Sequence, residues 1–331
     1  MTRSRKLADI AAAYAAGNPL SFRNRIINGS AIIGQRGVVN VTTTTPAYGT
    51  DRMLAGVVAG TGINVNLFKS SFGGSSSGLA HYITGSFTNG TPYWAQRIEA
   101  QNCQDLNSQW VTVSGLLYHD AGSTLNFTPR LSKAPSVDSF AGATAIATNA
   151  NVSVPSGVVT PFTTRFQLGS TDASNGLMFE MFLAGTATVT GKNFCITDLQ
   201  LEKGVIQTLF ENRFVGFELA LSQRYYQQWD YSAALGSGGA TALPATKFSN
   251  TDTILATAGT NGPMRATPTV TSSNSSVRAI FNTAQTSATI SGLAINSNGA
   301  GVLMITCANN SLAAGFGWID QLGIIKATAE L

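Results

Sequence analysis

The feature that most constrains this chain is a short run of alternating apolar and polar residues, repeated many times. The run WVTVSGLLYH at 110–119 is a clear example. Val111 and Val113 belong to one face of an extended strand. Thr112 and Ser114 belong to the other face. Side chains alternate between the two faces of a β-strand, so this period of two indicates a half-buried antiparallel strand.

Comparable runs recur between residues 23 and 210, separated by turn-forming residues. They are 37–45, 62–70, 81–87, 93–100, 110–119, 123–131, 158–168, 177–185, 186–191 and 194–204. In the last run we expect two opposite faces, made by Phe194, Ile196, Asp198 and Gln200 and by Cys195, Thr197, Leu199 and Leu201. Many short strands without helices between them indicate a β-sandwich of the jelly-roll type.

The composition supports this interpretation, because only 11% of the residues are charged, against about 25% in an average soluble domain. Gly, Ser, Thr and Asn take the place of the charges. Thr suits a pleated surface, and Gly and Asn accept the backbone conformations of tight turns.

A different pattern appears in the segment ENRFVGFELALSQRYYQQWD at 211–230, which has no glycine after Gly216. We expect a short helix near 217–223 that leads into a strand, and strands resume after a loop at 236–245. The sequence therefore predicts an all-β chain with an N-terminal attachment helix (1–20), a jelly-roll domain (21–215), a linking helix and strand (216–228) and a C-terminal β-sandwich (229–331).

The N-terminal segment has a basic start followed by alanines. We interpret it as an amphipathic helix with Leu7, Ile10 and Tyr14 on one face, stopped by Pro19 and the residues before it. Because this helix is too short to be stable alone, we assign these three residues to attachment. A signal peptide is the alternative, but Asp9 interrupts the apolar region. The sequence has no run of 18 apolar residues, the length that a membrane-spanning helix needs, so we expect no membrane insertion.

The charge and the cysteine content argue against several classes of protein. The net charge of +4 is spread along the chain and forms no basic run, so we expect no nucleic-acid partner. Three cysteines, Cys103, Cys195 and Cys307, are an odd and widely spaced set, which argues against a disulfide framework or a zinc site. We expect at least two buried free thiols.

No catalytic constellation is visible, so we expect the chain not to be an enzyme. The 16 acidic residues are scattered, whereas glycoside hydrolysis needs two facing carboxylates. The two histidines, His81 and His119, are expected to be exposed at strand ends. We expect no cofactor and no metal site, with calcium near Asp51 or Asp120 as the one ion considered.

Several motifs, taken in order, resemble a recurring tail-fibre module of phages and prophages. They are NRIINGSAIIGQRG (24–37), YGTDRML (48–54), TDLQLEKGVIQTLFENR (197–213), FELALSQRYYQ (217–227) and GPMRATPTVT (262–271), and the chain ends on TAEL (328–331). Three positions depart from the module: Met53 stands where an aromatic residue is usual, Leu209 where proline is common, and Ser222 where cysteine is usual.

This resemblance implies a structural virion protein made in the host cytoplasm, usually a homotrimeric tail fibre. It implies a first domain similar to carbohydrate-binding jelly rolls, an N-terminus held by other tail or virion proteins, and a receptor such as a host surface polysaccharide or lipopolysaccharide. A capsid decoration or head-fibre protein with a purely structural role is the alternative. A cellular carbohydrate-binding module is a third interpretation. The resemblance carries no functional residue over to this chain.

Exposed aromatic residues are the candidates for sugar binding, because sugar rings pack their C–H faces on them. We place the receptor-binding candidates at Trp318, near two glycines, and at Trp229 and Tyr231, after the domain boundary. The other candidates, which we expect mostly in the core or in subunit contacts, are Tyr93, Trp94, Trp110 and Tyr118. We also expect Arg36 or Arg52 to pair with Glu202 or Glu211, with independent solvated charges as the alternative.

Overall fold

The computed structural model describes residues 22–231, 243–247, 253–259, 264–281, 284–295, 302–308, 315–320 and 323–331. The expected attachment helix with Leu7, Ile10 and Tyr14 lies outside these residues. The chain divides into two compact units, one of Met1–Glu218 with Leu331 and one of Leu219–Glu330. In the part of the chain that the structure describes, no helix is long and apolar enough to cross a membrane.

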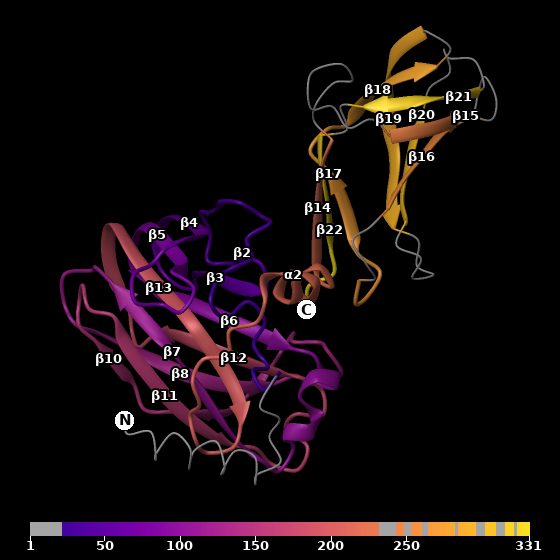
Figure 1. Ribbon diagram of the computed structural model, residues 1–331. Coiled ribbons are helices and arrows are strands. Elements are labelled where there is room, and N and C mark those ends of the chain that lie inside the picture. Colours follow the sequence, from indigo (N-terminus) through magenta and orange to yellow (C-terminus); the bar gives the residue numbers. More distant parts are fainter. Residues whose placement is uncertain are drawn as a thin grey trace. The chain divides into compact units, whose positions relative to one another are not determined.

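The first unit consists of two antiparallel sheets (Figure 1). The six-stranded sheet has the order β1 (Val39–Val41), β4 (Thr61–Ser71), β5 (Leu79–Gly90), β13 (Ala187–Lys203), β7 (Trp110–His119) and β11 (Thr160–Gln167). The seven-stranded sheet has the order β10 (Val152–Val154), β8 (Leu125–Lys133), β12 (Leu177–Leu183), β6 (Pro92–Ile98), β3 (Met53–Val57) and β2 (Ala47–Thr50), with β9 (Thr144–Thr148) paired to β8. Two short 3-10 helices, η1 (Ala100–Asn102) and η2 (Gln104–Leu106), follow β6.

The core of the first unit lies between these sheets. Val111 and Val113 of β7 and Phe179 and Met181 of β12 are fully or almost fully buried in the same apolar cluster. Their alternating positions on each strand follow from the period of two, because every second side chain points inward. The expected β-sandwich is therefore confirmed for the first unit.

Strand β13 departs from the strict alternation expected for 194–204. Phe194 and Ile196 are buried in the core, and so are Leu199 and Leu201, which we had placed on the opposite face. A register shift between Thr197 and Gln200 inserts an extra residue in the pairing with β7. A β-bulge of this kind reverses the phase of the alternation, so both apolar pairs reach the same core.

The helix expected near 217–223 is confirmed as α2 (Val215–Gln223), and it leads into strand β14 (Tyr226–Tyr231). In the second unit, β14 pairs with β22 (Gly323–Thr328), which also pairs with β17 (Thr269–Ser272).

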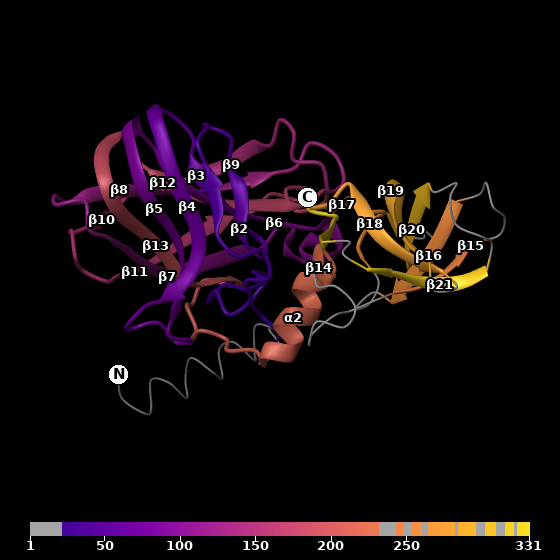
Figure 2. The same cartoon turned by 90° about the horizontal axis from the view of Figure 1, so that it is seen from above.

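Six further strands of the second unit form a closed barrel (Figure 2). Their order is β15 (Leu243–Lys247), β16 (Thr253–Gly259), β20 (Val302–Ala308), β19 (Ala284–Ile295), β18 (Ser276–Phe281) and β21 (Gly315–Asp320). The C-terminal β-sandwich that we expected is thus corrected to a barrel and a small separate sheet. Strands of a sandwich and strands of a barrel both alternate apolar and polar residues, so the sequence pattern does not distinguish the two architectures. In the closed barrel every strand has a partner on both sides, so no edge strand is left.

The ion pairs join partners different from those expected. Glu202 lies 3.5 Å from Arg23, and Glu211 lies 3.5 Å from Arg213. The Arg36 Nε atom is 4.0 Å from a carboxylate oxygen of Asp51. Glu202 of β13 and Glu211, in the segment that follows β13, thus pair with arginines other than Arg36 and Arg52.

Candidate functional site

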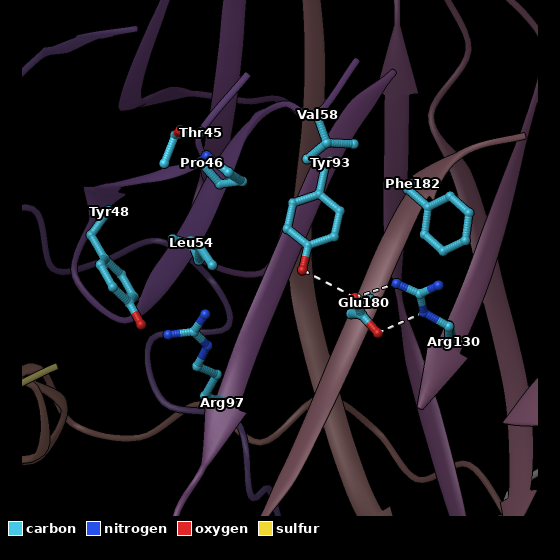
Figure 3. Close-up of a pocket in the computed structure, with 10 residues that line it drawn as sticks. All are labelled: Thr45, Pro46, Tyr48, Leu54, Val58, Tyr93, Arg97, Arg130, Glu180 and Phe182. Carbon is cyan, nitrogen blue, oxygen red and sulfur yellow. Dashed lines mark hydrogen bonds and ion pairs between the residues drawn. The ribbon is translucent and has the colours of Figure 1, made fainter. Parts of the chain in front are cut away.

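A hollow of about 620 Å³ lies on the outer face of the seven-stranded sheet, away from the core. Residues of strands β2, β3, β6, β8 and β12 line it, together with neighbouring loop residues (Figure 3). The lining residues are Thr45, Pro46, Tyr48, Leu54, Val58, Tyr93, Arg97, Arg130, Glu180 and Phe182.

The register of the strands explains why these residues meet. Arg130 is paired with Glu180, and Glu180 with Ala95. Ala95 is paired in turn with Leu54, and Leu54 with Tyr48. One row of cross-strand neighbours therefore runs over five strands, with a small alanine near its middle and larger side chains on both sides. Cross-strand neighbours in such a row are close enough to interact.

Glu180 is the electrostatic centre of the hollow and is only 2% exposed. Its carboxylate accepts hydrogen bonds from Arg130 Nε at 2.7 Å and Arg130 Nη2 at 2.6 Å. The Tyr93 hydroxyl donates at 3.1 Å and the Ser132 hydroxyl at 2.7 Å. Figure 3 shows Glu180 between Tyr93 and Arg130. A buried carboxylate requires such partners, and a two-bonded arginine is the strongest among them.

These contacts change the acidity of the neighbouring groups. The hydrogen bond to Glu180 raises the pKa of Arg130. Burial, and then the negative charge of Glu180, raise the pKa of Tyr93. Both side chains therefore keep their protons throughout the physiological range. Tyr93 donates its one hydroxyl proton to Glu180, and Arg130 has further N–H groups for a ligand.

The two arginines also contact aromatic rings. The Arg130 guanidinium carbon is 4.9 Å from the ring centre of Phe182, and that of Arg97 is 5.6 Å from the ring centre of Phe140. Arg97 also donates to the main-chain carbonyl oxygen of Leu331, which accepts a second hydrogen bond from the Tyr48 hydroxyl at 3.3 Å. Planar guanidinium groups held over rings lose little mobility when they bind a further acceptor.

The candidates for receptor binding lie elsewhere in the chain. Trp229 is half-buried on β14 and is paired with Ile325. Tyr231, two residues further on the same strand, is paired with Gly323. Trp318 belongs to the barrel, on β21. Their roles stay predictions, and the structure brings Trp229 and Tyr231 together on one strand but places Trp318 in another sheet.

Sequence reasoning missed Arg130 and Glu180, although a signal was present. Glu180 is the one charged residue of the otherwise apolar strand β12, and a charge in such a strand indicates a buried pair. Of the two neighbouring aromatic candidates on β6, Tyr93 lines the hollow and Trp94 is 1% exposed in the core. Tyr93 and Trp94 are consecutive residues of a strand, so their side chains point to opposite faces of the sheet.

The two histidines are buried, which corrects the exposed strand-end positions that we expected. His81 is 2% exposed and His119 is 0% exposed. His81 Nε2 lies 2.8 Å from the carbonyl oxygen of Asn28, so it donates, and Nδ1 lies 2.5 Å from the Thr50 hydroxyl. Burial lowers the pKa of His81 to about 4 and also lowers the pKa of His119. Both rings are neutral parts of the structure at pH 7.

In the described ranges, no three His, Cys, Asp or Glu side chains group as metal ligands would. The two aspartates considered for calcium have other partners. Asp51 accepts from the Gln35 main-chain amide at 2.6 Å, and Asp120 accepts from the amide and side chain of Asn193, both at 2.7 Å. Cys103 and Cys195 are buried free thiols, as expected.

No protein-family model and no curated protein matches the chain. Among solved structures, a CBM22-1 xylan-binding domain from Paenibacillus barcinonensis matches with a TM-score of 0.33 and 11% identity, covering 56% of this chain and 96% of that chain. A tandem CBM22-1-CBM22-2 domain from the same organism matches with a TM-score of 0.34 and 10% identity, covering 93% and 90%.

The enzymatically active domain of tailspike protein 4 from bacteriophage CBA120 matches with a TM-score of 0.34 and 9% identity. The match covers 55% of this chain but only 21% of the tailspike chain. The first unit is a two-sheet antiparallel β-sandwich.

Proposed function

We propose that the chain binds a carbohydrate in the hollow of the seven-stranded sheet. The observation that carries this proposal is the set of three aromatic side chains, Tyr48, Tyr93 and Phe182, around an open volume that also holds two arginines. Ligand sites combine an apolar lining with a few fixed polar groups. A sugar matches this lining, because its C–H faces pack on rings while its hydroxyls bond to fixed donors.

We further propose that the hollow binds a sugar without cleaving it. Glu180 is the one carboxylate among its lining residues. Four hydrogen bonds from Arg130, Tyr93 and Ser132 already occupy that carboxylate. Hydrolysis of a glycosidic bond uses a pair of carboxylates on opposite sides of the bond. The arrangement of Glu180 favours a structural role for this charge.

For the whole chain we propose a role in a phage particle, as a homotrimeric tail fibre that binds a host surface polysaccharide or lipopolysaccharide. The motifs between residues 24 and 271, which follow one another in the same order as in the tail-fibre module, support a role in a phage tail. Residues 1–20 would attach the fibre to other virion proteins, and Trp229, Tyr231 and Trp318 remain candidates for further receptor contacts.

The binding proposal is tested with the full chain on an array of bacterial surface glycans. We expect Tyr48→Ala and Phe182→Ala to weaken binding about tenfold each, because truncated aromatic anchors in a site commonly cost this much. Trp110→Ala is the matched control, since Trp110 is an aromatic residue with 43% exposure in the other sheet. Absence of binding by the unchanged protein, or an equal loss in the control, would contradict the proposal.

The setting is tested by immuno-electron microscopy of phage particles, which should place the chain on the tail. Label on the capsid would favour a decoration or head-fibre protein instead.

Deletion of residues 1–18 should abolish incorporation into particles while the remaining chain still folds. A deleted chain that no longer folds would contradict the attachment role.

A further inference from the structure

The outer face of the six-stranded sheet carries a row of apolar side chains that runs across four strands. Phe68 of β4 is paired with Tyr82 of β5, Tyr82 with Cys195 of β13, and Cys195 with Tyr118 of β7. We call these four residues the aromatic row. Neighbouring strands are about 4.8 Å apart, so the row is about 14 Å long.

A polar row runs parallel to it. Asn40 of β1 is paired with Asn66 of β4, Asn66 with Thr84 of β5, and Thr84 with Asn193 of β13. We call these four residues the amide row. On β4, β5 and β13 each member stands two positions from a member of the aromatic row, so the rows share one face and lie about 7 Å apart.

Contacts with a neighbouring ring, that of Phe72, hold two rings of the aromatic row in place. Phe72 is buried and contacts Tyr82 and Tyr118 edge to face, with ring centres 6.4 and 5.6 Å apart. Phe68 and Tyr82 stack with ring centres 5.5 Å apart. Phe68, Tyr82 and Tyr118 are themselves only half-buried. Part of each ring therefore stays accessible in a fixed position.

The amide row is also ordered by its own hydrogen bonds. Asn40 Nδ2 donates to Asn64 Oδ1 at 3.0 Å and to Asn66 Oδ1 at 3.1 Å. The Thr84 hydroxyl donates to Asn193 Oδ1 at 2.9 Å. Asn64 and Asn66 are exposed. A carboxamide whose oxygen accepts within the protein still has two N–H donors for a ligand.

We propose that the two rows form a second binding surface, for a neutral polysaccharide, on the opposite side of the sandwich from the hollow. The aromatic row takes the C–H faces of the sugar rings, and the amide row bonds to the hydroxyls. No member of the two rows is charged, and the carboxylate of Asp120 accepts two hydrogen bonds from Asn193. The eight uncharged residues of the rows favour a neutral polymer over an anionic one, and the length of the rows favours several sugar units.

The test uses the full chain in native electrophoresis through gels that contain soluble xylan, β-glucan or galactan. We expect the unchanged protein to be retarded in at least one gel, and Phe68→Ala to weaken this binding about tenfold. Asn66→Ala should weaken it in the same gel, and because Asn66 is exposed this variant serves if Phe68→Ala does not fold. Phe182→Ala is run in the same gels, so that binding in the hollow is told apart from binding at the two rows.

The matched control is Trp110→Ala, which removes an exposed aromatic residue from the same strand as Tyr118, about 26 Å away along β7. The proposal is overturned if no gel retards the unchanged protein or if Trp110→Ala loses binding equally. It is also overturned if Phe68→Ala changes the sedimentation coefficient, because the face would then be a contact between copies. Loss of retardation in Phe182→Ala alone would leave the hollow as the binding site and remove the second surface.

Discussion

Glu180 illustrates how a single charged residue is accommodated inside an apolar strand. Burial of a lone carboxylate is costly, and the sandwich compensates the cost with two hydrogen bonds from Arg130 and two from hydroxyl groups. The same contacts fix the positions of Tyr93 and Arg130, which line the hollow. One buried charge thereby orders the groups that are proposed to contact a sugar.

The Glu180→Gln variant measures this contribution. The amide loses the charge that Arg130 requires, so we expect the free energy of unfolding to fall by about 2 kcal/mol. Denaturation by urea, followed by fluorescence, gives the value. Asp172→Asn is the control, because Lys133 and Asp172 form a more exposed pair, and we expect a loss below about 1 kcal/mol. Equal losses in both variants would show that Glu180 has no special role.

His81 makes stability depend on pH. Its pKa is about 4 in the folded chain, against 6.5 for an unperturbed histidine. Below pH 6.5 the unfolded chain binds a proton that the folded chain does not bind. The free energy of unfolding is therefore lowered as the pH falls from about 6.5 to about 4, by about 3 kcal/mol in total.

Urea unfolding of the unchanged protein and of His81→Gln, between pH 7.5 and pH 4.5, tests this dependence. Glutamine does not titrate, so the variant should have the flatter profile. It should retain part of the slope, because the pKa of His119 is lowered as well. Parallel profiles for the two proteins would contradict the assignment.

At the scale of elements, the segment before α2 is fastened to the beginning of the described chain. Arg213 donates to the carbonyl oxygens of Asn24 and Ile26 and to Glu218 at 2.9 Å. Glu218 in turn accepts from the main-chain amide of Asn28 at 2.8 Å. The side chains of Arg213 and Glu218 thus provide hydrogen-bond partners for the main-chain groups of Asn24, Ile26 and Asn28, as a neighbouring strand would in a sheet.

Arg213→Ala tests this fastening. Removing one partner of a buried network leaves uncompensated charges on Glu211 and Glu218, and we expect the free energy of unfolding to fall by about 3 kcal/mol. Arg165→Ala, at an exposed position of β11, should change it by less than about 0.5 kcal/mol. A loss as small as that of the control would show that the network contributes nothing to stability.

Strands and helix differ in how far the sequence predicts them. The run 110–119 coincides with β7, and the helix at 217–223 lies within α2. The second half of β13 was assigned to the wrong face. The apolar residues change phase between Ile196 and Leu199, but only the pairing with β7 shows that a β-bulge keeps both apolar pairs in one core. Local patterns therefore locate the elements but miss irregularities that a neighbouring strand imposes.

At the scale of the whole molecule, the chain contains two compact units, and the first has a continuous core of its own. We expect two transitions in calorimetry. Leu131→Ala, at a position with 0% exposure in the first core, should cost that unit about 3 kcal/mol. Its transition should move down by roughly 9 °C while the other stays in place. A single transition that shifts as a whole would show that the two units unfold together.

The sequence alone determined the β class, the sandwich of the first unit and the helix that follows it, because periods of two and of 3.6 are local properties. Only the tertiary structure decided the rest. Closure of the C-terminal barrel, the burial of both histidines and the partners of Glu180 all depend on strand register. Register brings together residues distant in the sequence, such as Arg130, Glu180 and Tyr48, and no local pattern records which strands become neighbours.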